Sequence, residues 1–312
     1  MVYTELGHTG IKVSRLCFGT LTLGPGQKGL GREQGTALLS YALEQGINFF
    51  DTAEIYRTYS YLRPLLKSHR SRMVIASKSY AVTRADMQKS LGNCLSELGV
   101  EEIDLFLLHE QESELTLRGH AEAWEELIRA KERGLVRAIG LSTHYPAGVS
   151  AGTALPDLDV IHPLINMAGM GIAGGGREDM LKAIRQASDC GKGIYAMKAL
   201  AGGHLYRQAR EALHYAFNIP GVHSVAVGMQ TETEISYNCR IAEGGVPEKA
   251  NAELPGERRL HVEDWCTGCG ECAAACPQEA LSLSSGRVHL TGECILCGYC
   301  ALACKNFCLK VI

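Results

Sequence analysis

Residues 33–51, EQGTALLSYALEQGINFFD, contain one complete helix-to-strand unit. Apolar residues recur at helical spacing from Glu33 to Gln45, and Gly46 stands where the C-cap of a helix is expected. The apolar run that follows is short and ends at the polar residue Asp51, as a buried strand does. This stretch therefore predicts a helix that is followed at once by a strand.

The same alternation continues through about the first 230 residues. Eight strand-like runs end near Phe18, Asp51, Lys78, His109, Ser142, Asn166, Lys198 and Gly228. Amphipathic stretches lie between them, for example Glu33–Gln45, Arg84–Leu98, Ala121–Arg133, Arg177–Ser188 and Ala209–Phe217. Eight strands, each usually followed by a helix, predict an α/β fold of the closed (β/α)₈ TIM-barrel type. A doubly wound open sheet is the alternative that the same pattern allows.

The bulk composition is that of an ordinary globular protein. Of 312 residues, 46% are hydrophobic and 21% are charged, which suits one large domain and one small domain. The net charge of −3 does not indicate the basic surface of a nucleic-acid-binding protein. No apolar run approaches the roughly 20 residues that span a bilayer. The first residues lack the features of a signal peptide. We therefore expect a cytoplasmic protein with neither nucleic acid nor a membrane as a partner.

The chain changes character toward its C-terminal end. The segment Glu243–Arg259 is rich in Gly, Pro, Glu and Lys and has no apolar period, as expected of a connector. Nine of the thirteen cysteines follow it, between Cys266 and Cys308. We expect three parts: a barrel over residues 1–242, a linker over 243–259 and a small α+β domain over 260–312.

Eight of these cysteines form two runs with the same spacing, Cys-x₂-Cys-x₂-Cys-x₃-Cys. This spacing is that of the bacterial ferredoxins, in which three thiolates hold one [4Fe–4S] cluster and the fourth reaches the other cluster. We therefore expect two clusters and a dicluster ferredoxin-like domain. The two ligand sets are Cys266, Cys269, Cys272 with Cys304, and Cys294, Cys297, Cys300 with Cys276.

One alternative metal, and two departures from the ferredoxin pattern, accompany this interpretation. Zinc in Cys₄ sites is the other metal chemistry open to cysteines, but zinc modules normally use two separated pairs. The proline that follows the first run, Pro277, is replaced by Lys305 after the second, which removes no ligand. Cys308 has no place in the pattern, and we expect it to pack in the core or to lie near a cluster.

Polar residues with acid–base chemistry follow three successive strands of the predicted barrel, where barrel enzymes keep their catalytic groups. They are Asp51 and Tyr56 after one strand, Lys78 in the next, and His109 after the third. Singly, each has a simpler interpretation, since an Asp often caps a helix and a lone His often makes a structural hydrogen bond. Their occurrence at successive strand ends favours an active site.

These residues also carry a family resemblance. The first 240 or so residues resemble the aldo-keto reductases, and the remainder is similar to a ferredoxin-type extension found in one subgroup. The matching segments are Leu6–Ser14, Gly46–Tyr56, Val136–Ser142 and Ala196–Gly203. The resemblance implies that Tyr56 is the general acid, that Lys78 lowers its pKa, that Asp51 holds Lys78, and that His109 orients the carbonyl.

The resemblance also implies a set of nicotinamide-cofactor residues. They are Gly19, Thr20, Ser142, Thr143, His162, Met197, Lys198, Gly228, Glu234 and Asn238. The cation that should pair with a 2′-phosphate is missing, because Gln230, Thr231 and Glu232 stand in that region. NADP and NAD therefore both stay open as the cofactor.

Two functions follow from the two halves of the chain. The first is NAD(P)H-dependent, reversible reduction of a small aldehyde or ketone, with the clusters serving electron transfer or sensing. The second is a ferredoxin-type electron-transfer protein whose barrel docks a redox partner or binds another cofactor, such as a flavin. A simpler role for the clusters is to stabilise a small domain.

Overall fold

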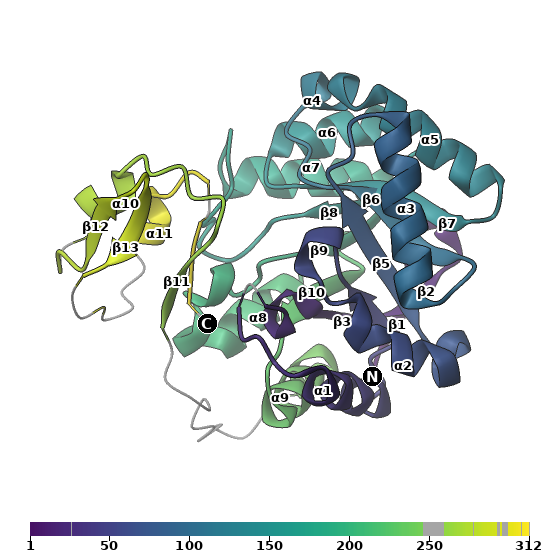
Figure 1. Cartoon of the computed structure of the whole chain (residues 1–312), viewed down its shortest axis with the longest axis horizontal. Helices are drawn as coiled ribbons and strands as arrows, with labels where there is room; N and C mark the ends of the chain where they lie inside the picture. The colour runs from purple at the N-terminus through teal and green to yellow at the C-terminus, as the bar shows by residue number, and fades with distance from the viewer. Residues whose placement is uncertain are drawn as a thin grey trace.

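The computed structural model of the chain describes residues 1–25, 27–245, 259–276, 278–291, 294, 299–306 and 308–311. Eight parallel strands close into a barrel in the order β10-β3-β4-β5-β6-β7-β8-β9, with helices around the outside (Figure 1). The strands are β3 Leu16–Gly19, β4 Phe49–Asp51, β5 Val74–Ser79, β6 Ile103–Leu108, β7 Val136–Thr143, β8 Val160–Pro163, β9 Gly193–Ala196 and β10 Ser224–Gly228.

The predicted barrel is confirmed, and the open-sheet alternative is wrong because β10 pairs with both β3 and β9. Predicted and observed strand ends differ most at the eighth strand element, β8, where Asn166 was expected and Pro163 is found. This difference arises because the segment after β8 stays extended: Leu164 still forms an isolated bridge to Met197.

Nine α-helices cover the barrel among the residues that the structure describes. They are α1 Arg32–Glu44, α2 Tyr59–His69, α3 Arg84–Leu98, α4 Glu114–Gly119, α5 Ala121–Glu132, α6 Pro146–Ala154, α7 Arg177–Asp189, α8 Ala209–Phe217 and α9 Glu232–Ala242. Short 3₁₀ helices are η1 Gly7–Thr9, η2 Thr20–Leu23, η3 Glu54–Tyr56, η4 Arg70–Arg72, η5 Ala201–Gly203 and η6 Tyr206–Gln208. The five stretches expected to be helical are helices within one or two residues at each end.

Sequence pattern alone did not indicate α2 or α6. Helix α2 contains Pro64, a residue that disfavours helix interiors, and α6 is built from small residues with Pro146 at its first turn. Tertiary packing overrides these weak local signals, since α2 buries Leu62 and Leu65 against the barrel.

The bottom of the barrel is closed by the N-terminal hairpin β1 Tyr3–Glu5 and β2 Lys12–Ser14. Gly7 follows the first strand with φ +58, and a Cβ there would stand 2.3 Å from the backbone nitrogen of Gly193. The hairpin therefore lies directly against the start of β9, and only glycine allows this approach. Leu6 and Ile11 of the same segment fill the lower barrel interior.

Side chains on the inner face of the strands stack in layers from this plug upward. Phe49 points inward and packs on Tyr195, with ring centroids 4.9 Å apart. Since side chains on a strand alternate, Asp51 lies on the same inner face as Phe49, one layer nearer the carboxyl end. The apolar interior thus ends in a polar layer at the barrel top.

The C-terminal part forms a separate small lobe beside the barrel (Figure 1). Its elements are β11 Leu260–Val262, α10 Glu271–Ala274, β12 Leu281–Ser284, β13 Arg287–Leu290, α11 Tyr299–Ala303 and β14 Leu309–Val311. Strands β11 and β14 pair antiparallel, as do β12 and β13. Most of the expected linker, residues 246–258, lies outside the described residues.

Strand β14 attaches this lobe to the loop that follows β9. It contacts η5, and His204 Nε2 donates a 3.2 Å hydrogen bond to the carbonyl of Leu309. Ala301 of α11 packs with Met170 and Ala201 of the barrel. Because η5 follows the carboxyl end of β9, the lobe lies next to the end of the barrel that carries the polar layer.

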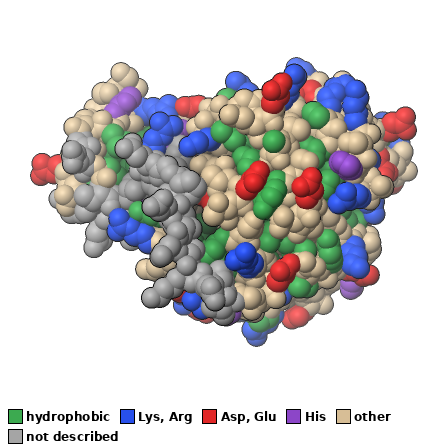
Figure 2. Space-filling model, turned by 90° about the horizontal axis from the view of Figure 1, so that it is seen from below, with side chains coloured by type: hydrophobic (Ala, Val, Ile, Leu, Met, Phe, Trp, Pro, Cys, Tyr) green, Lys and Arg blue, Asp and Glu red, His purple; other side chains and the backbone are tan. Residues whose placement is uncertain are grey.

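The outer surface is ordinary. On the face shown in Figure 2, acidic and basic side chains are interspersed over the barrel rather than gathered by sign. Within the described ranges, no helix combines the length and the apolar composition that a membrane crossing requires.

Candidate active site

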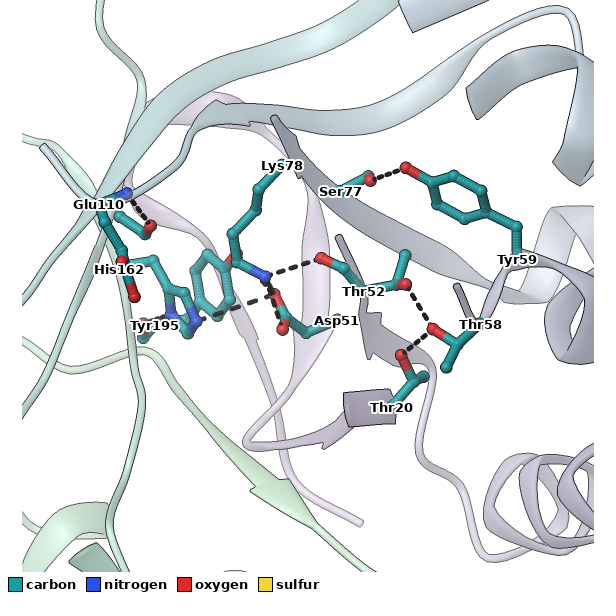
Figure 3. Close-up of polar contacts among 11 residues, drawn as sticks. Thr20, Asp51, Thr52, Thr58, Tyr59, Ser77, Lys78, Glu110, His162 and Tyr195 are labelled. Atoms are coloured by element: carbon teal, nitrogen blue, oxygen red, sulfur yellow. Dashed lines mark hydrogen bonds and ion pairs between the residues drawn. The ribbon is translucent and has the colours of Figure 1, made fainter. Parts of the chain in front are cut away.

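A buried ion pair stands at the top of the barrel (Figure 3). Lys78 Nζ donates to the carboxylate of Asp51 at 2.8 Å and to the carbonyl of Thr52 at 2.7 Å. The register of β4 and β5 brings the two residues together, since Asp51 lies opposite Ala76. Lys78 is 1% exposed and Asp51 is 4% exposed, so each charge depends on the other for its stability in the core.

Tyr195 and His162 support this pair from the far side of the barrel (Figure 3). Tyr195 donates from its phenol to Asp51 Oδ1 at 3.0 Å. The His162 ring stacks on the Tyr195 ring at 3.8 Å, and its Nδ1 donates to the Tyr195 carbonyl at 2.5 Å. Burial lowers the pKa of His162 to about 4, so the imidazole is neutral at pH 7.

Tyr56 lies at the end of η3, which follows β4. Two anchors fix this short helix: Ser79 Oγ donates to Glu54 Oε2 at 2.8 Å, and Arg57 closes the turn with φ +56. A non-glycine residue in the left-handed region carries backbone strain, as often found at functional sites. The anchored turn holds the Tyr56 ring with its centroid 5.0 Å from Lys78 Nζ.

The pKa of Tyr56 is shifted upward, whereas the family resemblance implied that Lys78 lowers it. Burial first, and then the negative charge of Asp51, raise the pKa of Tyr56 well above its usual range. Lys78, whose ammonium binds Asp51 and the Thr52 carbonyl, does not offset these two effects. Tyr56 is therefore fully protonated at neutral pH.

His109 stands beside Tyr56, with ring centroids 5.9 Å apart and the rings edge to face. Its other face stacks on Tyr80 at 4.3 Å. Burial and the charge of Lys78 lower the pKa of His109 well below its usual range, so this imidazole is also neutral. Among the described residues, its buried Nδ1 has no hydrogen-bond partner. A neutral histidine with an unsatisfied ring nitrogen suits a carbonyl ligand.

A cavity of about 540 Å³ opens above these residues. Most of the expected cofactor and catalytic residues line it: Gly19, Asp51, Tyr56, His162, Met197, Lys198, Gly228, Glu234 and Asn238. The cavity thus runs from the ion pair, over the end of β9, to the first turns of α9. Its volume, and a largely apolar lining with a few polar and charged side chains, are those of a small-molecule site.

Five expected site residues do not line the cavity. Lys78 and His109 lie directly beneath its wall, in contact with Asp51 and near Tyr56. Thr20 is fully buried and hydrogen-bonds to Thr58 at 2.8 Å.

Ser142 and Thr143, the other two of these five residues, form hydrogen bonds within loops at the barrel top. Ser142 Oγ accepts the backbone N–H of Glu110 at 2.9 Å, and Thr143 Oγ1 accepts that of Tyr145 at 2.9 Å. These hydroxyls shape the loops after β6 and β7. The resemblance implied that Ser142 and Thr143 bind the cofactor, and this stays a prediction.

Cations that sequence analysis did not single out line the same cavity. Arg207 and Arg210 enter from η6 and α8, and Lys310 enters from β14 of the C-terminal lobe. Their positions in the sequence gave no signal, because none follows a barrel strand directly. The cavity thus has cations in its lining, although Gln230 stands where the resemblance implies one.

Two tyrosines after Tyr56 pack in the core. Tyr59 donates to or accepts from Ser77 Oγ at 2.7 Å, and Tyr61 donates to the Leu30 carbonyl at 2.8 Å. Both side chains are buried. Neither side chain is among the residues that line the cavity, so both contribute to packing.

The C-terminal lobe gathers its cysteines into one core. Seven described cysteines belong to it or pack against it: Cys266, Cys272, Cys276, Cys294, Cys300, Cys304 and Cys308. Cys269 is exposed, and Cys297 lies outside the described residues. Within the described ranges, no three potential ligands stand close enough together for a single metal ion.

The end of the second cysteine run lies against the first run. Beyond Cys304, Lys305 Nζ binds Glu271 at 2.8 Å and Asn306 Nδ2 donates to Thr267 at 3.1 Å, and both partners lie in the first run. The backbone N–H of Cys308 donates to Cys304 Sγ at 3.2 Å. Hydrogen bonds, led by that from the Cys308 side chain, lower the pKa of Cys304 to about 6, which favours the thiolate form that a cluster ligand requires.

Comparison with known proteins identifies both parts. Residues 15–212 match the model of the aldo/keto reductase family, and residues 259–305 match that of a 4Fe-4S dicluster domain. The chain therefore belongs to the aldo/keto reductase family, and its C-terminal part matches a dicluster domain. The resemblance noted in the sequence is confirmed.

Individual relatives agree with this assignment. The chain is 28% identical to the aldo-keto reductase YhdN of Bacillus subtilis over 184 residues, which is 54% of each chain. It is 32% identical to the methylglyoxal reductase DkgA of Yersinia pestis over 112 residues, 35% of this chain and 40% of the relative. The chain thus spans about half the length, or less, of these curated relatives.

Solved structures extend the likeness over more of the chain. A Pseudomonas aeruginosa protein assigned to the aldo-keto reductases matches with a TM-score of 0.68 and 28% identity, covering 78% of this chain and 95% of that one. The holo form of aldo-keto reductase AKR11C1 from Bacillus halodurans shares the fold, with a TM-score of 0.64 at 20% identity over 80% and 93% of the two chains.

Proposed function

We propose that the protein reduces a small aldehyde or ketone at the barrel top, using a nicotinamide cofactor, and that Tyr56 is the general acid. The observation that carries this proposal is the arrangement of four groups. The Asp51–Lys78 pair lies below Tyr56, His109 stands beside it, and the cavity opens above. A carbonyl oxygen held between Tyr56 and His109 would meet a hydroxyl donor and a neutral imidazole.

The protonation states support reduction in particular. Tyr56 holds its proton because burial and Asp51 raise its pKa, and a general acid must be protonated before it can donate. As negative charge develops on the carbonyl oxygen, the ammonium of Lys78, 5.0 Å from the Tyr56 ring, would stabilise the tyrosinate left behind. Asp51 and Tyr195 are positioning residues in this account, since they fix Lys78.

The cavity suits a nicotinamide dinucleotide, which would supply the hydride. Met197 would flank the nicotinamide ring, and Glu234 and Asn238 at the far end would meet the adenosine. Arg207 and Arg210 offer cationic partners for phosphate, so both NADPH and NADH belong in the test. His109 Nδ1, buried without a partner among the described residues, fits a site completed by a ligand.

We further propose that the C-terminal lobe holds two [4Fe–4S] clusters in the crossed ligand sets, Cys266, Cys269, Cys272 with Cys304, and Cys294, Cys297, Cys300 with Cys276. The gathered thiols and the N–H donor at Cys304 Sγ support this assignment, and a cubane needs wider ligand spacing than a single ion. Such clusters supply one-electron transfer. Strand β14 would bring them near the cavity, and a redox partner protein could exchange electrons with them.

The experiment compares Tyr56→Phe with Tyr59→Phe in iron-replete, full-length protein, using a panel of small carbonyls with NADPH or NADH. Both variants lose one phenol oxygen, but only Tyr56 lies at the cavity. The proposal predicts that carbonyl-dependent nicotinamide oxidation falls by about a thousandfold or more in Tyr56→Phe. It also predicts activity near wild type in Tyr59→Phe. Equal activity in the wild type and in Tyr56→Phe would overturn the proposal.

A further inference from the structure

Lys310 connects the C-terminal lobe to the barrel cavity. Of the described residues in 259–311, it alone lines that cavity, and it does so from β14. The side chain is 3% exposed, so its ammonium points into the protein interior and not into solvent. A buried lysine needs partners for its charge, and those partners explain its position.

Two groups of the lobe hold the Lys310 ammonium in place. Lys310 Nζ binds Glu263 Oε1, and it lies 4.7 Å from the centre of the Trp265 ring. Pairing of β11 with β14 places Val262 opposite Leu309, which brings the adjoining Glu263 and Lys310 together. Glu263 and Trp265 thus contact the ammonium from within the lobe.

Lys198 meets Lys310 from the barrel side. It follows β9, lines the same cavity and has a φ of +61, a conformation that lysine rarely adopts. The backbone at Lys198 is therefore strained, and this strained conformation sets the direction of the side chain. Burial, followed by the charge and contact of Lys310, lowers the pKa of Lys198 to about 7.

Two ammonium groups in contact within a cavity wall repel each other. Glu263 of the lobe and Glu110 of the barrel offset part of this repulsion, since both act on Lys198 with the opposite sign. Neither carboxylate is among the residues that line the cavity. An anion entering the cavity would contact both ammonium groups and relieve the repulsion that remains.

We propose that Lys198 and Lys310 form an oxyanion subsite, which takes a phosphate or carboxylate oxygen of the molecule bound in the cavity. The C-terminal lobe then contributes directly to ligand binding. This inference rests on the proposed function only in taking the cavity as the binding site, and it requires no hydride transfer. It also gives the lobe a role in the barrel's chemistry beyond holding clusters.

The test measures binding of three probes to the full-length, iron-replete protein by anaerobic calorimetry: inorganic pyrophosphate, ADP-ribose and malonate. The variants are Lys198→Met, Lys310→Met and the double variant Lys310→Met/Glu263→Gln, which removes both charges of the buried pair together. Loss of one charged hydrogen-bond donor should weaken binding about tenfold. The matched control, Lys305→Met, removes an exposed lysine of the same lobe and should bind like wild type.

Each outcome has a defined meaning. Weaker binding of pyrophosphate and ADP-ribose alone supports the subsite and assigns it to the phosphates of a nucleotide. Weaker binding of malonate alone supports it and assigns it to a substrate carboxylate. Unchanged binding of all three probes by the double variant, with the iron content and melting temperature of wild type, overturns the inference. The probes undergo no reduction, so their binding is measured independently of carbonyl turnover, and failure of the proposed reduction and failure of the subsite are distinguishable.

Discussion

Tyr195 donates a hydrogen bond of 3.0 Å to Asp51 Oδ1, although the two residues lie 144 positions apart in the chain. The same carboxylate binds Lys78. A buried carboxylate is stable only when several donors satisfy it. The phenol of Tyr195 therefore helps to hold the Asp51–Lys78 ion pair in position next to Tyr56.

We expect Tyr195→Phe to lower both stability and turnover. Removing a hydrogen bond to a buried charge should reduce the free energy of unfolding by about 1.5–3 kcal/mol. Turnover should fall several-fold because Asp51 and Lys78 gain freedom to move, while the KM for the carbonyl changes little. Urea unfolding and steady-state kinetics measure the two effects.

Tyr59→Phe is the control for this prediction. It also removes a buried phenol hydrogen bond, that with Ser77, but it leaves Asp51 untouched. It should cost about 1 kcal/mol of stability with no loss of turnover. If both variants lose turnover equally, Tyr195 has no positioning role that is specific to the ion pair.

The raised pKa of Tyr56 predicts a directional pH dependence. Since Tyr56 stays protonated well beyond neutral pH, the rate of carbonyl reduction should be flat between about pH 6 and pH 9. The reverse oxidation of an alcohol needs the tyrosinate, so its rate should rise steadily with pH over the same range. A reduction rate that falls tenfold per unit across this range would show that Tyr56 deprotonates there and contradict the assignment.

Part of the fold and of the candidate site could be predicted from the sequence, and the reason is physical. Asp51, Lys78 and His109 lie at or beside the ends of three consecutive strands, and parallel strands bring those ends together at one face. Local apolar pattern fixes such strands, so the fold and the core of the site were predictable.

The features of the site that the sequence did not predict depend on contacts between segments that are distant in the chain. Tyr195 looked like an ordinary strand residue, and only closure of the barrel brings it to Asp51. Lys310 belongs to another part of the chain, and its place in the cavity depends on how β14 docks. The pKa of Tyr56 was expected in the wrong direction because burial, which no sequence pattern reveals, outweighs the neighbouring ammonium.

The crossed cluster assignment predicts different outcomes for two neighbouring cysteines. Cys304→Ala should remove one ligand of the first cluster and lower the iron content from about eight to about four atoms per chain. Cys308→Ala should keep the full content, because Cys308 contributes only hydrogen bonds near Cys304. Iron analysis of anaerobically prepared protein decides, and equal losses in both variants would make Cys308 a ligand.

The pKa of Lys198 near 7 predicts pH-dependent anion binding. The charged groups that act on it are Lys310 and Glu263 of the lobe and Glu110 of the barrel, and the imidazoles of His144 and His162, neutral at this pH, interact with it as well. Below pH 7 Lys198 already carries its charge, whereas above pH 7 it must take up a proton when an anion binds. The affinity for pyrophosphate or malonate should therefore fall as pH rises through about 7, by up to tenfold per unit.

Lys198→Met should make this profile flat over the same range. A wild-type affinity that is independent of pH from about 6 to 8 would show that Lys198 is not the group that titrates on binding.

The central claim is that the barrel site transfers hydride to a carbonyl with Tyr56 as the acid. The most direct measurement mixes the anaerobic, iron-replete protein with reduced nicotinamide, with and without a small carbonyl, and follows nicotinamide and cluster absorbance together. The account predicts that nicotinamide is consumed only when carbonyl is present, while the cluster absorbance stays constant. Bleaching of the clusters by nicotinamide alone, with no carbonyl reduced, would contradict it and identify the barrel as an electron entry point for the clusters.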